Sequence, residues 1–82
     1  MTGWRTNRYL RFDDAGTSRS GKTREWAVFS KSQNSLLGMV SWYGPWRQYV
    51  FEPEDGCVFN NGCLDAISDF CTEQNTAHRD AS

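Results

Sequence analysis

Fifteen consecutive residues, 37–51, constrain the fold more than any other part of the chain. They contain five aromatic side chains, one arginine and the pair Gly44-Pro45. Aromatic and β-branched residues favour strands, whereas a Gly-Pro pair is typical of a turn. We therefore expect a strand at Leu36 to Tyr43, another at Trp46 to Glu52, and the turn between them. Two strands joined so closely pair antiparallel, because a parallel pair needs a crossover of about a dozen residues.

A turn centred on Gly44-Pro45 also predicts the faces of this hairpin. Its expected cross-strand pairs are Tyr43 with Trp46, Trp42 with Arg47, Val40 with Tyr49, and Gly38 with Phe51. Side chains alternate between the two faces of a sheet, so each pair shares a face. The more apolar face, expected to meet the core, holds Gly38, Val40, Trp42, Arg47, Tyr49 and Phe51. The mixed face, expected to be partly wet or covered by a partner, holds Leu37, Met39, Ser41, Tyr43, Trp46, Gln48, Val50 and Glu52.

Two more segments alternate as strands do. In residues 8–12, Leu10 and Phe12 share a face. In residues 23–30, Trp26 and Val28 share a face. Residues 13–22 between them are charged and turn-rich, without large apolar groups, and predict a mobile loop.

The C-terminal part of the chain has the pattern of an amphipathic helix. Asn60-Asn61 offers an N-cap, and from there to about Gln74 apolar residues recur at three- and four-residue steps. The apolar positions are Cys63, Leu64, Ile67, Phe70 and Cys71. Asp65, Asp69 and Glu73 line the opposite side.

These elements predict an α+β fold: a small antiparallel sheet of about four strands with one C-terminal helix packed on one face. We expect a single domain over residues 1–82, with a folded core at 5–74, a mobile loop near 13–22 and a disordered tail at 75–82. The mixed sheet face carries more apolar surface than a small monomer leaves wet, so we also expect a homodimer or larger assembly.

The charge of the chain is unevenly distributed. Residues 1–31 carry seven basic and three acidic side chains, a net charge of +4, and residues 32–82 carry two and seven, a net charge of −5. This asymmetry indicates either an anion-binding half or two halves that attract each other. No apolar run is long enough to span a bilayer, and the first twelve residues lack a secretory signal pattern, so we expect a cytoplasmic protein without a membrane partner.

Three cysteines and one histidine do not predict a metal site. Cys57, Cys63, Cys71 and His78 follow the spacing C-x5-C-x7-C-x6-H, without the close pair that structural zinc sites use. The odd cysteine count gives no disulfide framework. We expect buried, inert thiols, no cofactor and no catalytic Cys–His pair. No serine has a partner histidine within the folded region, and the carboxylates fit a solvated helix face and a turn, so the sequence favours a protein that is not an enzyme.

The residues near the hairpin tip are the candidate ligand site. Aromatic faces stack on nucleobases and arginine binds phosphate through a planar fork, so the two together suit a nucleotide or a short single strand. The candidate residues are Tyr43, Trp46 and Arg47 near the tip, with Arg19, Lys22 and Arg24 of the basic loop as helpers. The alternative interpretation is packing alone: Trp42 and Arg47 form a cross-strand cation–π pair, and the other aromatics belong to the core or to a protein-binding patch.

The loop of residues 16–23 matches the pattern G-x4-G-K-T of a nucleotide triphosphate loop. That motif works when a helix N-terminus follows it and directs backbone N–H groups at the phosphates. Here the sequence predicts a following strand, so we interpret the match as accidental.

The stretch L-G-x-V-x-W-Y-G-P-W-R-x-Y-x-F-x-P (37–53), followed by Cys63-Leu64-x-x-Ile67-x-x-Phe70, resembles a family of short, mostly uncharacterised proteins of tailed phages and prophages. The resemblance covers about half of the chain, residues 26–71 at most. It implies a phage-encoded protein made in the cytoplasm of the infected bacterium. It implies no agreed activity, but small phage proteins of this kind often bind a host defence protein or sequester a nucleotide signal.

The sequence therefore predicts a small binding protein that holds an anionic nucleotide-type ligand against aromatic and arginine side chains. Nucleic acid is a less favoured ligand. The alternative is a protein–protein inhibitor or accessory protein that binds a host protein through its aromatic sheet face.

Overall fold

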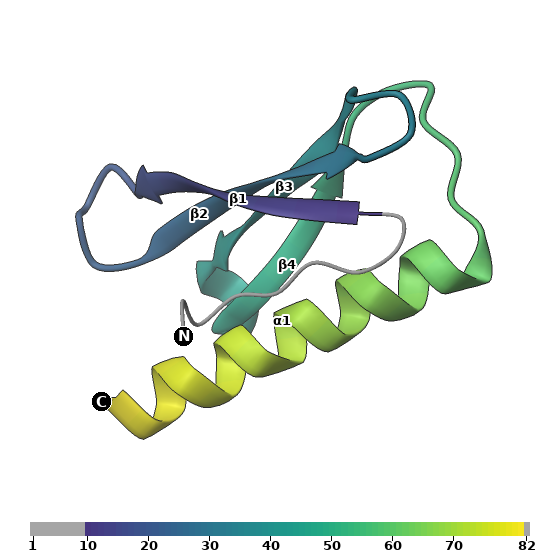
Figure 1. Cartoon of the computed structure of the whole chain (residues 1–82). Helices are drawn as coiled ribbons and strands as arrows, with labels where there is room; N and C mark the ends of the chain where they lie inside the picture. Colours follow the sequence, from purple (N-terminus) through teal and green to yellow (C-terminus); the bar gives the residue numbers. More distant parts are fainter. Residues whose placement is uncertain (1–9, 82) are drawn as a thin grey trace.

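A four-stranded antiparallel sheet is covered on one face by a single long helix (Figure 1). The computed structural model describes residues 10–81. Their elements are β1 (Leu10–Thr17), β2 (Arg24–Ser30), β3 (Leu36–Tyr43), a 3₁₀ turn (Gly44–Trp46), β4 (Gln48–Pro53) and α1 (Asn61–Ala81). The strands lie in the sheet in sequence order. The predicted α+β class, with about four strands and a C-terminal helix on one face, is confirmed.

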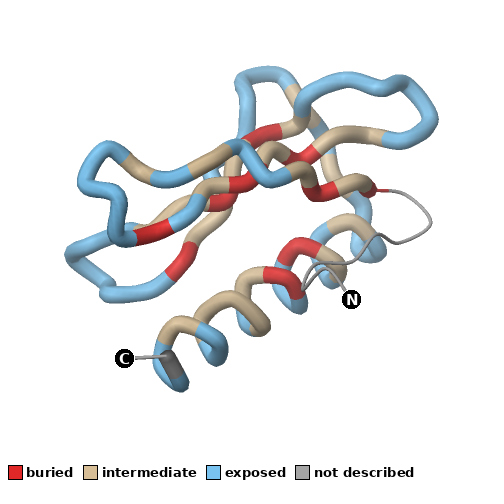
Figure 2. Tube along the Cα trace, turned by 60° about the vertical axis from the view of Figure 1, so that its left-hand side comes forward, coloured by how far each residue is buried: buried red, intermediate tan, exposed pale blue. Residues whose placement is uncertain are grey.

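The core lies between the sheet and α1, where the buried residues of Figure 2 gather. Phe70 of α1 stacks on Phe12 with ring centroids 4.3 Å apart, and Trp26 approaches Phe70 edge-on at 5.2 Å. Leu10 and Phe12 of β1 are both buried, as are Trp26 and Val28 of β2, so the predicted shared face of each pair is confirmed. The buried apolar residues are Leu10, Phe12, Trp26, Val28, Val40, Tyr49, Ile67 and Phe70.

The predicted pairing of the β3–β4 hairpin is wrong by two residues. Trp42 lies opposite Tyr49, Val40 opposite Phe51, and Gly38 opposite Pro53. The reason is the loop, which takes four residues: the 3₁₀ turn is followed by Arg47 in the left-handed conformation, with φ 55° and ψ 49°. Because the offset is even, the strand residues keep their predicted faces.

The predicted face of Leu37 is also wrong. A bulge interrupts the pairing of β2 with β3, where Val28 pairs with Gly38 but Phe29 pairs with Leu36. A bulge adds one residue to one strand and redirects its side chain. Leu37 accordingly packs against the buried core, while Leu36 is 38% exposed.

The loop between β1 and β2 is shorter than predicted. Residues 13–17 continue β1, and the connection is limited to residues 18–23. Asp14 pairs with Trp26 and Gly16 with Glu25, so a bulge at Ala15 lies within the extended strand. Gly16 has φ 100° and donates its N–H to Asp14 Oδ1 at 2.7 Å. Residues 8 and 9 of the predicted first strand lie outside the described residues.

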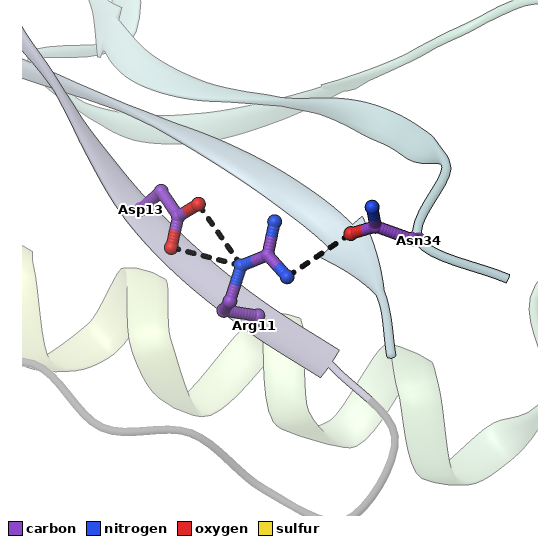
Figure 3. Close-up of polar contacts among 3 residues, drawn as sticks. All are labelled: Arg11, Asp13 and Asn34. Atoms are coloured by element: carbon purple, nitrogen blue, oxygen red, sulfur yellow. Dashed lines mark hydrogen bonds and ion pairs between the residues drawn. The ribbon is translucent and has the colours of Figure 1, made fainter. Parts of the chain in front are cut away.

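Polar contacts fix β1 to the turn that follows β2 (Figure 3). Arg11 Nε donates to Asp13 Oδ2 at 2.9 Å, and its Nη1 donates to Asn34 Oδ1 at 3.1 Å. The guanidinium carbon also lies 4.6 Å from the ring centroid of Phe29. Charged side chains on an edge strand such as β1 oppose pairing with further strands.

The helix starts where predicted but ends later. Asn60 Oδ1 accepts a hydrogen bond from Cys63 N–H at 2.9 Å, so Asn60 is the predicted N-cap. The expected disordered tail at 75–82 is wrong for the residues described there, because α1 continues to Ala81. Leu64, expected on the packed face, is 50% exposed. Within residues 10–81, no helix is both long and apolar enough to cross a membrane.

Candidate functional site

Three segments meet at one end of the sheet. In a meander of four strands, the β1–β2 and β3–β4 connections fall at the same end, and Figure 1 shows both on the side of the molecule where α1 ends. The structure thus brings the predicted basic loop, the predicted hairpin tip and the last turns of α1 into one region.

Tyr43 and Trp46 pack against each other at the hairpin tip. Their ring centroids are 5.0 Å apart in an edge-to-face arrangement. Tyr43 is 39% exposed and Trp46 is 66% exposed. Tyr43 belongs to the sheet face away from α1, because its neighbour Trp42 packs on the helix side. This pair is therefore separate from the grooves on the helix side.

Arg47 borders a groove between the hairpin tip and the end of α1, with a volume of about 410 Å³. We call it the tip groove. It is lined by Trp42, Arg47, Gln48, Asn75, His78 and Arg79. The Trp42 and His78 rings lie 4.3 Å apart between centroids, tilted by 36°, and form an aromatic wall. The predicted cross-strand pair of Trp42 with Arg47 is absent from the sheet register, yet both residues line this groove.

Lys22 and Arg24 border a second groove, of about 520 Å³, between the β1–β2 connection and α1. We call it the loop groove. It is lined by Thr17, Gly21, Lys22, Thr23, Arg24, Trp26, Tyr49, Gln74, Ala77 and His78. Arg19 lines neither groove. His78 lines both, so a single side chain of α1 divides them.

The β1–β2 connection is ordered by its own hydrogen bonds. Ser18 N–H donates to Thr23 O at 2.7 Å, Gly21 N–H donates to Ser18 O at 2.9 Å, and Thr23 Oγ1 donates to Ser18 Oγ at 3.0 Å. Strand β2, not a helix, follows this connection. The triphosphate-loop geometry is therefore absent here, as the sequence predicted.

Both grooves have a positive lining. Lys22 and Arg24 line one, Arg47 and Arg79 line the other, and no aspartate or glutamate occurs among the described residues that line either. Arg24 is partly neutralised, because its Nη1 lies 3.1 Å from Asp14 Oδ2. Within residues 10–81, the Arg47 side chain has no hydrogen bond or ion pair. A groove of this kind favours an anion.

Tyr49 lines the loop groove and packs against one tryptophan of each groove. Its ring packs edge-on against Trp26 at 5.6 Å and against Trp42 at 5.2 Å. Burial raises the pKa of the Tyr49 phenol, and a hydrogen bond with the Arg24 backbone partly offsets that rise. The phenol is therefore a neutral, fixed group.

Sequence reasoning missed the contribution of α1 to this site. The sequence predicts a disordered tail at 75–82, which would leave Asn75, His78 and Arg79 outside any site. A signal was present, since Cys71, Gln74, Asn75 and His78 continue the three- and four-residue steps of the helix. These residues are polar, so the hydrophobic pattern that marks a buried face ends before them.

The thiols and carboxylates form no second centre. Cys57, Cys63 and Cys71 are free and partly buried. Burial raises the pKa of the Cys71 thiol to about 11. In the described part of the chain, no three histidine, cysteine, aspartate or glutamate residues gather to hold a metal ion.

Comparison with known proteins gives one informative similarity. The chain is 31% identical over 52 residues to the "Uncharacterized 9.3 kDa protein" of Acholeplasma phage L2, and these residues make up 63% of this chain and 67% of that protein. No protein-family model matches the chain. No solved structure matches it either.

Proposed function

The chain belongs to the same family as the 9.3 kDa protein of Acholeplasma phage L2, and from this premise we propose that it is a phage-encoded binding protein for an anionic nucleotide-type ligand. It holds the ligand in the tip groove and performs no reaction on it. Sequestering such a ligand or signal in the cytoplasm of the infected host would counter a host defence. We also propose that this family is the family of tailed-phage and prophage proteins that carry the motif of residues 37–53.

The backbone of Arg47 is the observation that carries the proposal. Arg47 has φ 55°, a conformation that glycine adopts at much lower cost than other residues. Residues in strained conformations persist where the surrounding structure holds them, and they cluster at ligand sites. The turn fixes this backbone through hydrogen bonds from Arg47 N–H to the carbonyl oxygens of Tyr43 and Gly44. It thereby places a guanidinium with no protein partner among residues 10–81 at the border of a groove lined without carboxylates.

The tip groove matches the two parts of a nucleotide. Its aromatic wall of Trp42 and His78 suits a base, because stacking contributes about 1–3 kcal/mol per base. The guanidinium groups of Arg47 and Arg79 suit a phosphate, which they bind through two parallel hydrogen bonds. Gln48 and Asn75 add amide groups to the lining.

A ligand screen tests this function. We expect AMP, ADP or ATP to raise the melting temperature, and Arg47→Gly to abolish the rise. Glycine fits the left-handed backbone at this position, so the variant removes the side chain without distorting the turn. Lys31→Ala is the matched control, since it removes an exposed cation from the opposite end of the sheet.

Two results would contradict the proposal. One is the absence of any thermal shift across the nucleotides. The other is a shift that Arg47→Gly and Lys31→Ala reduce equally, because a non-specific charge effect does not depend on position. Inorganic pyrophosphate in the same screen measures the contribution of charge without a base.

A second candidate function uses the other face of the sheet. Helix α1 covers one face of the sheet (Figure 1). The Tyr43–Trp46 pair lies exposed at the hairpin tip. Exposed tryptophan and tyrosine are typical of the centres of protein interfaces. A protein that inhibits or assists a host protein through this aromatic face would ignore every nucleotide and retain one host protein in a pull-down. Trp46→Ser would abolish that retention.

A further inference from the structure

We propose that the two grooves act together and that the ligand is a linear dinucleotide, with one nucleotide in the tip groove and the phosphate of the other in the loop groove. This inference rests on the proposed function and adds the class of ligand. It follows from the shared wall, the size and the unequal chemistry of the two grooves.

The grooves share a wall. His78 lines both, and its ring lies 4.3 Å from that of Trp42 on one side and 6.1 Å from that of Tyr49 on the other. A ligand that passes over this one side chain enters both grooves. Small-molecule sites range from about 300 to 1,000 Å³. Each groove alone lies in the lower part of that range, at about 410 and 520 Å³, and the two together approach its upper end.

The grooves differ in the part of a ligand that they can bind. The tip groove has an aromatic wall, because Trp42 and His78 are both only half-buried. His78 lines both grooves, but its ring packs against Trp42 of the tip groove. The other aromatic residues of the loop groove, Trp26 and Tyr49, are each only 7% exposed and are occupied by edge-to-face packing with each other. They leave no ring face free for a base.

The loop groove is instead suited to a phosphate. Lys22 and Arg24 supply positive charge, and Thr17 supplies a hydroxyl group. The Ser18–Thr23 hydrogen bonds hold the connection in place before a ligand arrives. A preorganised loop loses little conformational entropy on binding. A phosphate here and a base in the tip groove require a ligand longer than a nucleoside monophosphate.

The test compares AMP, ATP and the linear dinucleotide pApA by isothermal titration calorimetry on four proteins. These are the natural protein, Lys22→Ala and Arg47→Gly, with Arg19→Ala as the matched control from the same loop. We expect pApA to bind at least about tenfold more tightly than AMP, since a second charged contact commonly contributes that factor. We expect Lys22→Ala to weaken pApA about tenfold and AMP by less than twofold, whereas Arg47→Gly weakens both.

The outcomes separate the two proposals. If AMP and pApA bind equally and Lys22→Ala changes neither, the dinucleotide assignment is wrong and the proposed function stands. If ATP binds as tightly as pApA with the same dependence on Lys22, the loop groove takes a phosphate chain and the dinucleotide assignment is again wrong. If no nucleotide binds, both proposals are wrong. Lys22 and Arg47 are exposed, and circular dichroism spectra that match those of the natural protein would exclude misfolding as the cause.

Discussion

The side-chain oxygen of Asn75 accepts a hydrogen bond from the backbone N–H of Tyr49 at 2.6 Å. Tyr49 lies in β4, an edge strand, and Asn75 lies in the part of α1 beyond the predicted helix end. The bond satisfies a ladder donor that has no neighbouring strand and ties the last turns of α1 to the sheet. The position of His78 in the grooves depends on this attachment.

We expect Asn75→Leu to lower the free energy of unfolding by about 1–2 kcal/mol, because it leaves the partly buried Tyr49 N–H without an acceptor. Asn75→Asp is the matched control, since it keeps an oxygen at the same place. Urea denaturation measures both. Equal stability of Asn75→Leu and the natural protein would show that water replaces the side chain at no cost.

A second stability prediction concerns Gly38, where β3 passes close to β4. A Cβ placed on this residue would meet the carbonyl oxygen of Glu52 and would lie 2.7 Å from the ring of Phe51. We expect Gly38→Ala to destabilise the fold by about 1–3 kcal/mol through overpacking. At Gly44 a Cβ meets nothing within 4 Å. Gly44→Ala is therefore expected to change the urea midpoint little, and equal effects of the two substitutions would contradict the close approach.

The alternation of side chains was sufficient to predict the sheet. Leu10 with Phe12, and Trp26 with Val28, face the core as their spacing requires. Strand β3 has the bounds expected from its composition. The even offset in the β3–β4 pairing preserved the predicted faces, because side-chain direction repeats every two residues while register depends on the turn.

The parts that could not be predicted depend on backbone conformation and on polar contacts. The left-handed Arg47 and the bulge beside Leu37 have no signature in hydrophobic periodicity. The last turns of α1 are stabilised by the Asn75–Tyr49 bond and the His78–Trp42 ring contact, both of which join residues far apart in sequence. Of the predicted site residues, Lys22, Arg24 and Arg47 line the grooves, whereas Tyr43, Trp46 and Arg19 do not.

The strain at Arg47 predicts opposite effects on stability and binding. We expect Arg47→Gly to raise the free energy of unfolding by about 0.5–1 kcal/mol, because glycine relieves the left-handed conformation. The same substitution is expected to abolish ligand binding, because it removes the guanidinium from the tip groove. Asn34 has φ 53° but also accepts a hydrogen bond from Arg11. Asn34→Gly is therefore expected to give no gain, and a gain there without one at Arg47 would contradict the prediction.

Burial of Cys71 predicts a dependence of stability on alkaline pH. Its thiol pKa is raised from 9.0 to about 11 in the folded protein, by desolvation. Between these values the unfolded chain loses the thiol proton while the folded chain keeps it, so deprotonation favours unfolding. The contribution of the protonated Cys71 thiol to the free energy of unfolding is complete below pH 9 and is lost as the pH rises toward 11. The raised pKa of Tyr49 acts in the same direction above pH 10.

Urea denaturation from pH 8 to 11 measures this effect. The slope of the free energy of unfolding against pH is compared between the natural protein and Cys71→Ala, because the substitution also alters packing. We expect the decline in the free energy of unfolding that begins near pH 9 to be smaller in Cys71→Ala. The decline above pH 10, to which Tyr49 contributes, remains in this variant. Native Cys71 should also react slowly with a thiol reagent at pH 8, because little of it is thiolate. An unchanged slope together with rapid labelling would show that the thiol is not desolvated.

The sheet face away from α1, which no other described element covers within residues 10–81, predicts self-association. Met39 lies opposite Ala27 in β2 and opposite Glu52 in β4, on the face away from α1, and Val50 lies on that face opposite Ser41. These apolar side chains are only half-buried. We expect a homodimer that buries this face. A stable interface of this kind buries roughly 800 Å² on each partner. Light scattering after size exclusion measures the mass. Met39→Lys is expected to give a monomer, because it places a charged side chain in the face that the dimer would bury. Ser32→Lys, in the turn after β2, is the control that keeps the dimer, and a monomeric natural protein at high concentration would refute the expectation.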